Sequence, residues 1–305
     1  MARYKVVVAS SISPPAKARL EEVAEILPLE RLNEAEGVYL DSEIKVDAAF
    51  LDRAGRVRAV ASKSVGYDLV DVAELTKRSI PFSNTKGSLS EAVADLAICL
   101  IIMIMRDILF GIDWVRSGEW VKDQPPLAID VGGKTLGIIG LGEIGLAVAK
   151  RARACGMQIA YHNRKQRPDD AATGATYFAF DELLRRSDCI LVMIPLNAET
   201  KGMFGAREFG VMKPGAFFVN AARGRIVDTQ ALYDALVSKK IKGAALEVTD
   251  PEPLPPDHQL LKLPNVVITP HIASATVETR NRMALLAVEN LIAGLDGKPM
   301  PTRVN

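Results

Sequence analysis

Short apolar segments alternate with amphipathic helical patterns along most of this 305-residue chain. Apolar runs typical of buried strands cover residues 4–9, 57–62, 135–140, 157–161, 189–194, 216–220, 243–247 and 266–269. Helical patterns lie between them at 15–26, 143–155, 181–186 and 229–239. Because two parallel strands need a crossover connection, buried strands separated by helices indicate parallel sheets. The pattern therefore predicts an α/β fold.

A long helical pattern at residues 90–115 suggests where the chain divides. It opens with Ser90, a plausible N-cap. The helix is apolar on nearly all of its faces, so it has more apolar surface than packing against a single domain would bury. We expect this segment to join two domains and, over residues 92–115, to meet a second copy in a homodimer. The last helix, 276–295, is long enough to return to the first domain. The expected domains are residues 1–100 plus 280–305, and residues 101–279.

Composition and charge exclude several classes of partner. The 38 Lys and Arg residues nearly balance the 37 Asp and Glu residues, so the net charge of +1 favours neither nucleic acid nor an anionic membrane. The most apolar run, 96–105, is shorter than the roughly 18 residues that a membrane span needs. No basic, apolar leader opens the sequence, so we expect a cytoplasmic protein. Cys99, Cys155 and Cys189 lie far apart, which predicts reduced core cysteines and no metal site.

A glycine-rich turn follows the predicted strand 135–140. The sequence Gly140-Leu141-Gly142-Glu143-Ile144-Gly145 fits G-x-G-x-x-G and opens a helix, which is the context that a dinucleotide site requires. The first glycine permits the tight turn, the second lets a pyrophosphate approach the helix N-terminus, and the third allows close packing of helix and strand. The motif predicts a Rossmann-type, doubly wound parallel sheet. The alternative is a turn whose glycines serve packing alone.

The next predicted strand ends in Tyr161-His162-Asn163-Arg164-Lys165. An NAD-specific fold usually places a carboxylate there for the ribose hydroxyls. This chain has two adjacent cations instead, and Arg164 and Lys165 could bind a 2'-phosphate that a carboxylate would repel. We therefore predict that NADP(H) is preferred over NAD(H). The alternative is that both are solvated loop charges.

Hydride transfer to a ketone requires a proton donor and a cation near the substrate oxygen, and histidine is the natural donor near neutral pH. Of the three histidines, His162 ends the cofactor strand, and His258 lies in a proline-rich loop where a local capping role is the simpler explanation. His271 follows the strand 266–269, at the sheet edge where open α/β folds place ligands. Arg223 and Glu252 follow two other strands in the same way. Each alone could be a surface charge, but their joint placement favours a site.

These segments carry a family resemblance that extends over nearly the whole chain. The motifs are Ser64-Val65-Gly66-Tyr67-Asp68, the glycine turn, Pro195-Leu196 with Glu199-Thr200, Met212-Lys213-Pro214-Gly215, Asn220 to Gly224, Pro251-Glu252-Pro253-Leu254-Pro255 and Pro270-His271. Together they resemble the D-isomer specific 2-hydroxyacid dehydrogenases, and within them the glyoxylate/hydroxypyruvate reductases. The resemblance implies a second, smaller, flavodoxin-like domain that binds substrate beside the dinucleotide-binding domain.

The resemblance also implies a reaction, the reduction of a small 2-oxoacid to the D-2-hydroxyacid. It implies that His271 is the acid/base, that Glu252 pairs with it, and that Arg223 binds the 2-oxoacid. The substrate carboxylate would be held by backbone N–H groups of Val65 and Gly66. Further cofactor contacts are expected from Asn163, Pro195, Thr200, Ala221 and Glu247. Two alternatives stay open: a reductase of a bulkier acid such as 2-ketogluconate, and a dinucleotide-sensing binding protein on the same scaffold.

Two positions depart from the family pattern. Where the family usually has Gly-Leu-Asp-Val, this chain has Ala245-Leu246-Glu247-Val248, and the aspartate is implied to bind the nicotinamide carboxamide. Glu247 could serve there with one more methylene group. Lys86 replaces a common proline, which either adds a cation near the substrate or leaves a solvated lysine.

Overall fold

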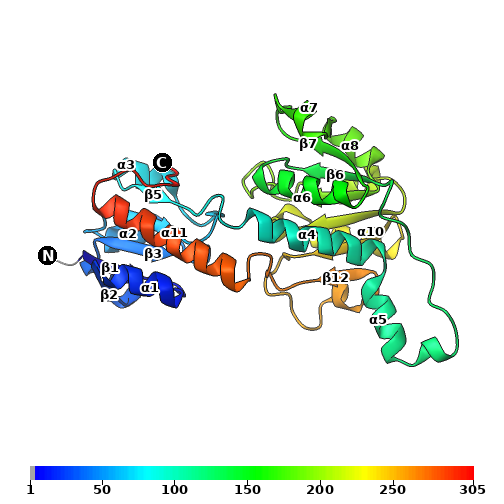
Figure 1. The fold of residues 1–305 in the computed structure, drawn as a ribbon, viewed down its shortest axis with the longest axis horizontal. Coiled ribbons are helices and arrows are strands. Elements are labelled where there is room, and N and C mark those ends of the chain that lie inside the picture. The colour runs from blue at the N-terminus through cyan, green and yellow to red at the C-terminus, as the bar shows by residue number, and fades with distance from the viewer. Residues whose placement is uncertain (1–3) are drawn as a thin grey trace. The chain divides into compact units, whose positions relative to one another are not determined.

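A computed structural model describes residues 4–305, and the chain divides into two compact units. Unit 1 comprises Met1–Leu89 and Ser274–Asn305, so it contains both ends of the chain, and unit 2 comprises Ser90–Ala273 (Figure 1). These boundaries differ from the expected ones at residues 100 and 280. Helix α4 (Ser90–Met105) packs on helix α6 (Glu143–Ala154) and on strands of unit 2, so it belongs to that unit from its first residue.

Unit 1 is a parallel five-stranded sheet with helices on both faces. The strand order is β2-β1-β3-β4-β5, with bounds β1 (Tyr4–Val8), β2 (Ala24–Leu27), β3 (Gly37–Leu40), β4 (Ala59–Ser62) and β5 (Phe82–Ser83). Side chains alternate between the faces, as Val6 and Val7 do. Helices α1 (Pro14–Glu21) and α11 (Val277–Leu295) cover the face of Val6, and the segments α2 (Ala48–Arg53), α3 (Val72–Lys77) and the 3-10 helix η1 (Leu29–Glu34) cover the other.

Unit 2 is a parallel seven-stranded sheet in the order β12-β11-β10-β9-β6-β7-β8. Its strands are β6 (Thr135–Ile139), β7 (Gln158–His162), β8 (Thr176–Tyr177), β9 (Cys189–Val192), β10 (Ala216–Asn220), β11 (Ile241–Leu246) and β12 (Val266–Ile268). Helices α4 and α6 bury their apolar residues on one face, and α8 (Phe180–Arg186), α9 (Ala206–Val211) and α10 (Thr229–Val237) on the other. The order reverses between β6 and β9, and ligands bind at such a switch point. The predicted α/β class and doubly wound sheet are confirmed.

The predicted helix over residues 15–26 is wrong in its second half. Helix α1 ends at Glu21, and Ala24–Leu27 forms the edge strand β2. The polar residues of this segment satisfy a helical pattern, but the backbone of Ala24–Leu27 pairs in register with Tyr4–Val7 of β1. Tertiary pairing thus overrides a local pattern that was compatible with either element. The short strands β3, β5 and β8 lie outside all of the predicted elements.

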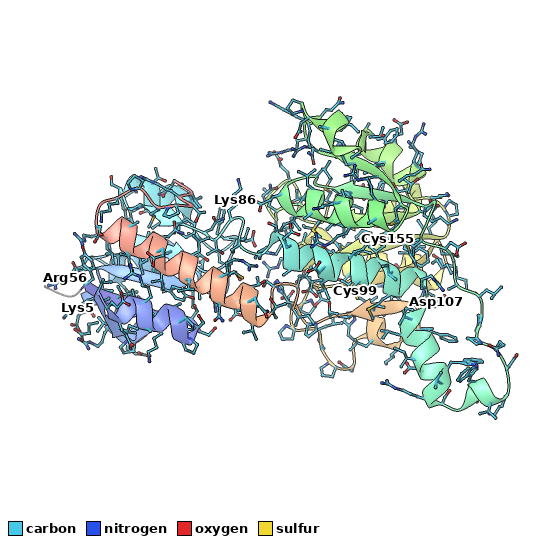
Figure 2. The ribbon with its side chains drawn as sticks, viewed as in Figure 1. Lys5, Arg56, Lys86, Cys99, Asp107 and Cys155 are labelled. Carbon is cyan, nitrogen blue, oxygen red and sulfur yellow. The ribbon has the colours of Figure 1, made fainter. Side chains whose placement is uncertain are left out.

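The predicted helix over residues 90–115 is two helices. Helix α4 ends at Met105, and α5 spans Ile108–Arg116. Asp107, at the junction, has a φ of 49° in the left-handed region, which breaks the helical path (Figure 2). Ser90 is the first helical residue, and its hydroxyl donates to Glu143 Oε1 at 2.6 Å, so the expected N-cap position is also wrong. The final helix agrees with prediction, since the Thr276 side chain caps α11.

The cysteines differ in exposure, which corrects the expectation that all three lie in the core. Cys189 is buried, and burial raises the pKa of its thiol. Cys155 is half-buried and Cys99 is exposed on α4 (Figure 2). Within residues 4–305, no helix is both long and apolar enough to cross a membrane.

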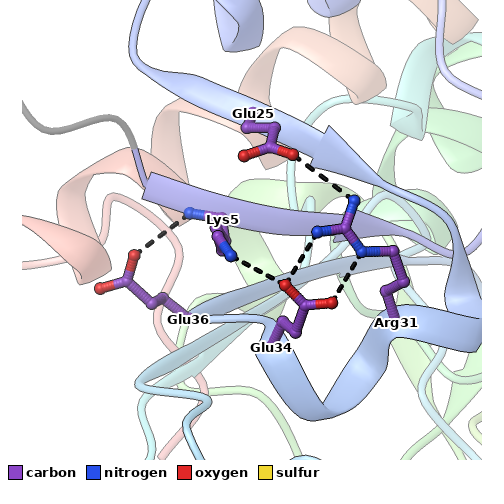
Figure 3. A network of polar contacts seen from close by, with 5 residues as sticks. All are labelled: Lys5, Glu25, Arg31, Glu34 and Glu36. Atoms are coloured by element: carbon purple, nitrogen blue, oxygen red, sulfur yellow. Dashed lines mark hydrogen bonds and ion pairs between the residues drawn. The ribbon is translucent and has the colours of Figure 1, made fainter.

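A polar network at the surface of unit 1 ties η1 to strands β1 and β2 (Figure 3). Glu34 accepts hydrogen bonds from Arg31 Nε at 2.7 Å and from Lys5 Nζ at 2.8 Å. Arg31 also lies 3.5 Å from Glu25 Oε1. The hydrogen bonds from Arg31 and Lys5 lower the pKa of Glu34 to about 2.

This lowered pKa predicts an acid-dependent contribution to stability. The Glu34 carboxylate stabilises the fold fully above its ordinary pKa of 4.5, and the contribution is lost as the pH falls through about 2. Glu34→Gln should therefore lower Tm slightly at pH 6, because the pairs are solvent-exposed, and the difference from wild type should shrink as the pH falls from 4.5 toward about 2. Thermal unfolding across this range tests the prediction, with Glu30→Gln in the same turn as control. A difference in Tm that is as large at pH 2 as at pH 6 would contradict it.

Candidate active site

The glycine turn lies between β6 and α6, at the switch point of the unit 2 sheet. Gly140 has a φ of 101°, and a Cβ atom there would lie 2.5 Å from the Met193 carbonyl oxygen. A Cβ atom on Gly145 would lie 2.4 Å from the Gly140 oxygen. Both positions therefore require glycine because neighbouring backbone leaves no room for a side chain.

Gly142 differs from the other two glycines of the turn, Gly140 and Gly145. It is the N-cap residue of α6 with φ −87° and ψ −158°, a conformation open to any residue, and a Cβ atom there would meet nothing within 4 Å. Packing within the protein thus does not explain this glycine. Open space directly before the first turn of a twelve-residue helix fits the approach of a pyrophosphate to the helix N-terminus. The turn is therefore suited to hold a dinucleotide.

The segment after β7 places the predicted cations at the surface. Arg164 and Lys165 are both exposed, and Arg164 lies 3.9 Å from Glu199 Oε2 with 88% of its side chain accessible. The side chain of Asn163 is engaged with the glycine turn, since its Oδ1 accepts from the Leu141 N–H at 2.7 Å. Asn163 therefore connects the end of β7 to the turn.

Arg167, which was not among the predicted site residues, also contacts the glycine turn. Its Nη1 donates to the Leu141 carbonyl oxygen at 2.9 Å, while Nε and Nη2 donate to the two carboxylate oxygens of Asp169. The ion pair with Asp169 is i,i+2 in sequence, so the arginine is held within its own loop. The third cation after Asn163 was the signal that could have identified it.

The loops after β9 and β10 continue the same edge of the sheet. Thr200 Oγ1 donates to the Pro195 carbonyl oxygen at 2.7 Å, which closes the turn that follows β9. Ala221 follows β10, and its N–H points to the Val192 carbonyl oxygen at the end of β9 at 3.4 Å. Three of the predicted cofactor positions, Pro195, Thr200 and Ala221, therefore lie in the loops after β9 and β10, the next two strands along the sheet from β6.

Arg223 is presented by a turn that the buried Asn220 shapes. Asn220 Nδ2 donates to the Arg223 carbonyl oxygen at 2.9 Å, and its Oδ1 accepts from the Ala222 N–H at 3.1 Å. The next residue, Gly224, packs so closely on the following loop that a Cβ atom would overlap the Thr249 carbonyl group. This contact joins the loop of Arg223 to the loop that carries Glu252.

Glu252 and His271 form a direct pair. His271 Nδ1 lies 2.6 Å from Glu252 Oε1, and the other carboxylate oxygen accepts from the Thr249 N–H at 3.3 Å. The hydrogen bond with His271 is the main cause that lowers the pKa of Glu252, and the charge of Arg223 adds to it. Glu252 is therefore ionised at neutral pH, and the Nδ1 contact leaves Nε2 as the ring nitrogen that can exchange a proton with a ligand.

The other two histidines have local partners. His162 Nδ1 lies 3.0 Å from the Phe178 carbonyl oxygen, and its ring stacks on Tyr177. His258 accepts from the Leu260 N–H at 3.2 Å and caps a 3-10 turn, as the simpler explanation proposed. His271 is the histidine that the structure brings next to a carboxylate, and it follows β12 while Arg223 and Glu252 follow β10 and β11.

Glu247, at the end of β11, is turned into the protein. Its side chain is buried, with Oε1 accepting from the Ala273 N–H at 2.5 Å and Oε2 accepting from the Thr269 hydroxyl.

In unit 1, the loop of Val65 and Gly66 follows β4, and Asn84 Nδ2 donates to the Val65 carbonyl oxygen at 2.9 Å. Lys86 in the same unit is exposed.

Unit 2 has the features of a dinucleotide-binding oxidoreductase domain: a doubly wound sheet with a glycine turn at its switch point, and a carboxylate–imidazole pair at the same carboxyl edge. Comparison with known proteins agrees with this class. Residues 98–273 match the model of the family described as "D-isomer specific 2-hydroxyacid dehydrogenase, NAD binding domain". The chain belongs to the D-isomer specific 2-hydroxyacid dehydrogenase family, and unit 2 contains its NAD binding domain.

Similar proteins within the family carry related names. The glyoxylate reductase of Thermococcus litoralis is 43% identical over 284 residues, which cover 91% of this chain and 86% of that protein. The glyoxylate/hydroxypyruvate reductase B of Klebsiella pneumoniae is 44% identical over 280 residues, covering 90% and 86%. An NADPH-dependent glyoxylate/hydroxypyruvate reductase from Sinorhizobium meliloti, solved with NADP and malonate, superposes with a TM-score of 0.91 at 35% identity, covering 99% and 97% of the two chains.

Proposed function

We propose that this protein reduces glyoxylate and hydroxypyruvate to the D-2-hydroxyacids, with NADPH as the reductant. The observation that carries the proposal is the 2.6 Å pair of Glu252 and His271, which lies at the carboxyl edge of the cofactor sheet, next along that edge to Arg223. The names of relatives at 43–44% identity point to the same substrates.

In this proposal His271 supplies the proton. When NADPH is bound, it would supply the hydride that reduces C2 of the substrate. Protonated His271 donates from Nε2 to the carbonyl oxygen, while ionised Glu252 accepts from Nδ1–H and fixes the ring orientation. The Arg223 guanidinium orients the substrate and stabilises the negative charge that develops on that oxygen. Loss of one such donor typically lowers kcat by about 10²- to 10³-fold.

Each unit contains residues that we propose to bind substrate or cofactor. Backbone N–H groups of Val65 and Gly66 are proposed to bind the substrate carboxylate, in a loop that Asn84 anchors through the Val65 carbonyl. The turn Gly140–Gly145 would hold the pyrophosphate, with Asn163, Pro195, Thr200 and Ala221 along the same edge.

The product of hydroxypyruvate should be D-glycerate, which chiral chromatography would show. Formation of the L enantiomer would contradict the proposal.

We propose that Arg164 and Lys165 bind the 2'-phosphate and set a preference for NADPH. Both are exposed at the end of β7, and no acidic residue stands among residues 161–165. Replacing Arg164 with Asp and Lys165 with Ala should raise KM for NADPH by about 10-fold or more, the loss of one to two charge-assisted contacts, and lower KM for NADH. Steady-state kinetics with both cofactors measures the shift. Unchanged NADPH kinetics would refute the role.

We further propose a homodimer through the face of α4 and α5. Ile108, Leu109, Ile112 and Val115 of α5 are all exposed, and α5 has no fully buried residue. The same apolar face on a second copy would cover it about a two-fold axis. Leu109→Lys with Ile112→Lys should convert a dimer into a monomer, as light scattering would show. Exchange of the surface residue Glu182 for Gln serves as control. A monomeric wild type would rule the dimer out.

A further inference from the structure

Glu247 is the buried carboxylate whose role the sequence left open. Only 1% of this residue is exposed, and both of its carboxylate oxygens accept hydrogen bonds from the segment that follows β12. Oε2 accepts from the Thr269 hydroxyl and Oε1 accepts from the Ala273 N–H at 2.5 Å. Its backbone carbonyl accepts from the His271 N–H at 3.1 Å. One residue therefore contacts positions 269, 271 and 273, on both sides of the histidine.

The histidine needs such support because of its backbone conformation. His271 has a φ of 54°, in the left-handed region that residues with a Cβ atom rarely adopt. A residue persists there only when its surroundings hold it. Its ring must also stay 2.6 Å from Glu252, which is carried by a different loop. Glu247 thus contacts every second residue of the histidine loop from 269 to 273, through the Thr269 hydroxyl and through the backbone N–H groups of His271 and Ala273.

We infer that Glu247 is a positioning residue, which acts through the backbone of the 269–273 loop to hold His271 against Glu252. This inference rests on the proposed function, because it assigns His271 the role of proton donor. It differs from the expectation that Glu247 binds the nicotinamide carboxamide. The extra methylene of glutamate, relative to the aspartate usual in the family, is what lets one carboxylate reach both Thr269 and Ala273.

The two roles predict opposite results for Glu247→Asp. A positioning residue that is shortened by one methylene loses its reach to Thr269 and Ala273, so kcat should fall by about 10-fold or more, equivalent to about 1.4 kcal/mol, while Kd for NADPH stays within about 2-fold of wild type. A residue that binds the carboxamide should tolerate Asp, or should change Kd for NADPH rather than kcat. Fluorescence titration gives Kd and NADPH oxidation with glyoxylate gives kcat. Glu182→Asp, the same change on the surface of α8, controls for nonspecific effects.

A second pair of variants tests the inference if Glu247→Asp fails to fold. Thr269→Val removes one donor to Glu247 and should lower kcat several-fold without changing Kd for NADPH. Thr269→Ser keeps the hydroxyl and should restore the kcat that Thr269→Val loses. Equal kcat in the Val and Ser variants, or a weakened Kd with unchanged kcat at saturating NADPH, would overturn the positioning role.

Amide hydrogen exchange separates this inference from the proposed function. The amides of His271 and Ala273 should exchange faster in Glu247→Asp and Thr269→Val than in wild type, whether or not the protein reduces glyoxylate. Wild-type protein that fails to oxidise NADPH with any 2-oxoacid would contradict the proposed function alone. Unchanged exchange at these two amides in both variants would contradict the positioning role alone.

Discussion

His271→Gln should reduce kcat for glyoxylate by about 10³-fold or more, within the range for loss of a general acid, and leave Kd for NADPH nearly unchanged. Glutamine keeps a similar shape and can still hydrogen-bond Glu252 across the present 2.6 Å contact, but it cannot donate a proton to the substrate oxygen. The glycine turn is formed by other loops, so cofactor binding should survive. Single-turnover and steady-state rates test the expected fall in kcat, and fluorescence titration tests the unchanged Kd for NADPH.

His258→Gln is the matched control for this experiment. Its ring caps a 3-10 turn by accepting from the Leu260 N–H, and it makes no part of the proposed site. We expect its kcat to equal that of wild type. A His271→Gln enzyme that retains more than about a tenth of wild-type kcat would remove His271 from the mechanism.

Gly142→Val should abolish NADPH binding while lowering Tm only slightly, because valine is a poorer N-cap residue than glycine. The residue already has an extended backbone conformation, and a Cβ atom would meet no protein atom within 4 Å. The side chain would instead occupy the space before the N-terminus of α6, where the pyrophosphate is expected. We expect Kd for NADPH to rise by at least about 100-fold, comparable to loss of several charge-assisted hydrogen bonds. Titration calorimetry and thermal unfolding provide the two measurements.

Gly140→Ala is the contrasting variant in the same turn. There the φ of 101° and the 2.5 Å approach to the Met193 carbonyl oxygen make a side chain incompatible with the fold. We expect this variant to lower Tm by several degrees, as a strained backbone does. If Gly142→Val lowers Tm as much as Gly140→Ala, the open space before α6 serves packing and not a ligand.

Elements were predicted correctly from the sequence where the hydrophobic pattern fitted only one type of secondary structure. The strands of unit 2 are buried on both faces, so their apolar runs and the glycine turn located the switch point. The prediction was wrong where the hydrophobic pattern was compatible with both a helix and a strand. Residues 24–27 fit the end of a helix, and pairing with β1 made them a strand. The break at Asp107 depends on one backbone angle that the apolar periodicity of 90–115 does not record.

In the candidate site too, some residues were predictable from the sequence and others were not. Strand-end positions predicted that Glu252 and His271 lie at one edge of the sheet, because parallel strands end together. The pairing of the two side chains was implied by the family resemblance, and they lie 2.6 Å apart. The support behind them was not visible in the sequence. Arg167 on the glycine turn, Gly224 against Thr249, and Glu247 beneath the histidine loop each depend on contacts between segments distant in sequence. Such contacts follow from the packed fold and not from local patterns.

The most direct test of the account is kcat/KM with NADPH for a panel of 2-oxoacids. Glyoxylate and hydroxypyruvate should exceed pyruvate and 2-ketogluconate by about 10-fold or more, a difference of at least about 1.4 kcal/mol in transition-state binding. A preference for 2-ketogluconate would contradict the assigned substrate class. Tight NADPH binding with no turnover of any acid would show that the protein senses the dinucleotide and does not reduce a 2-oxoacid.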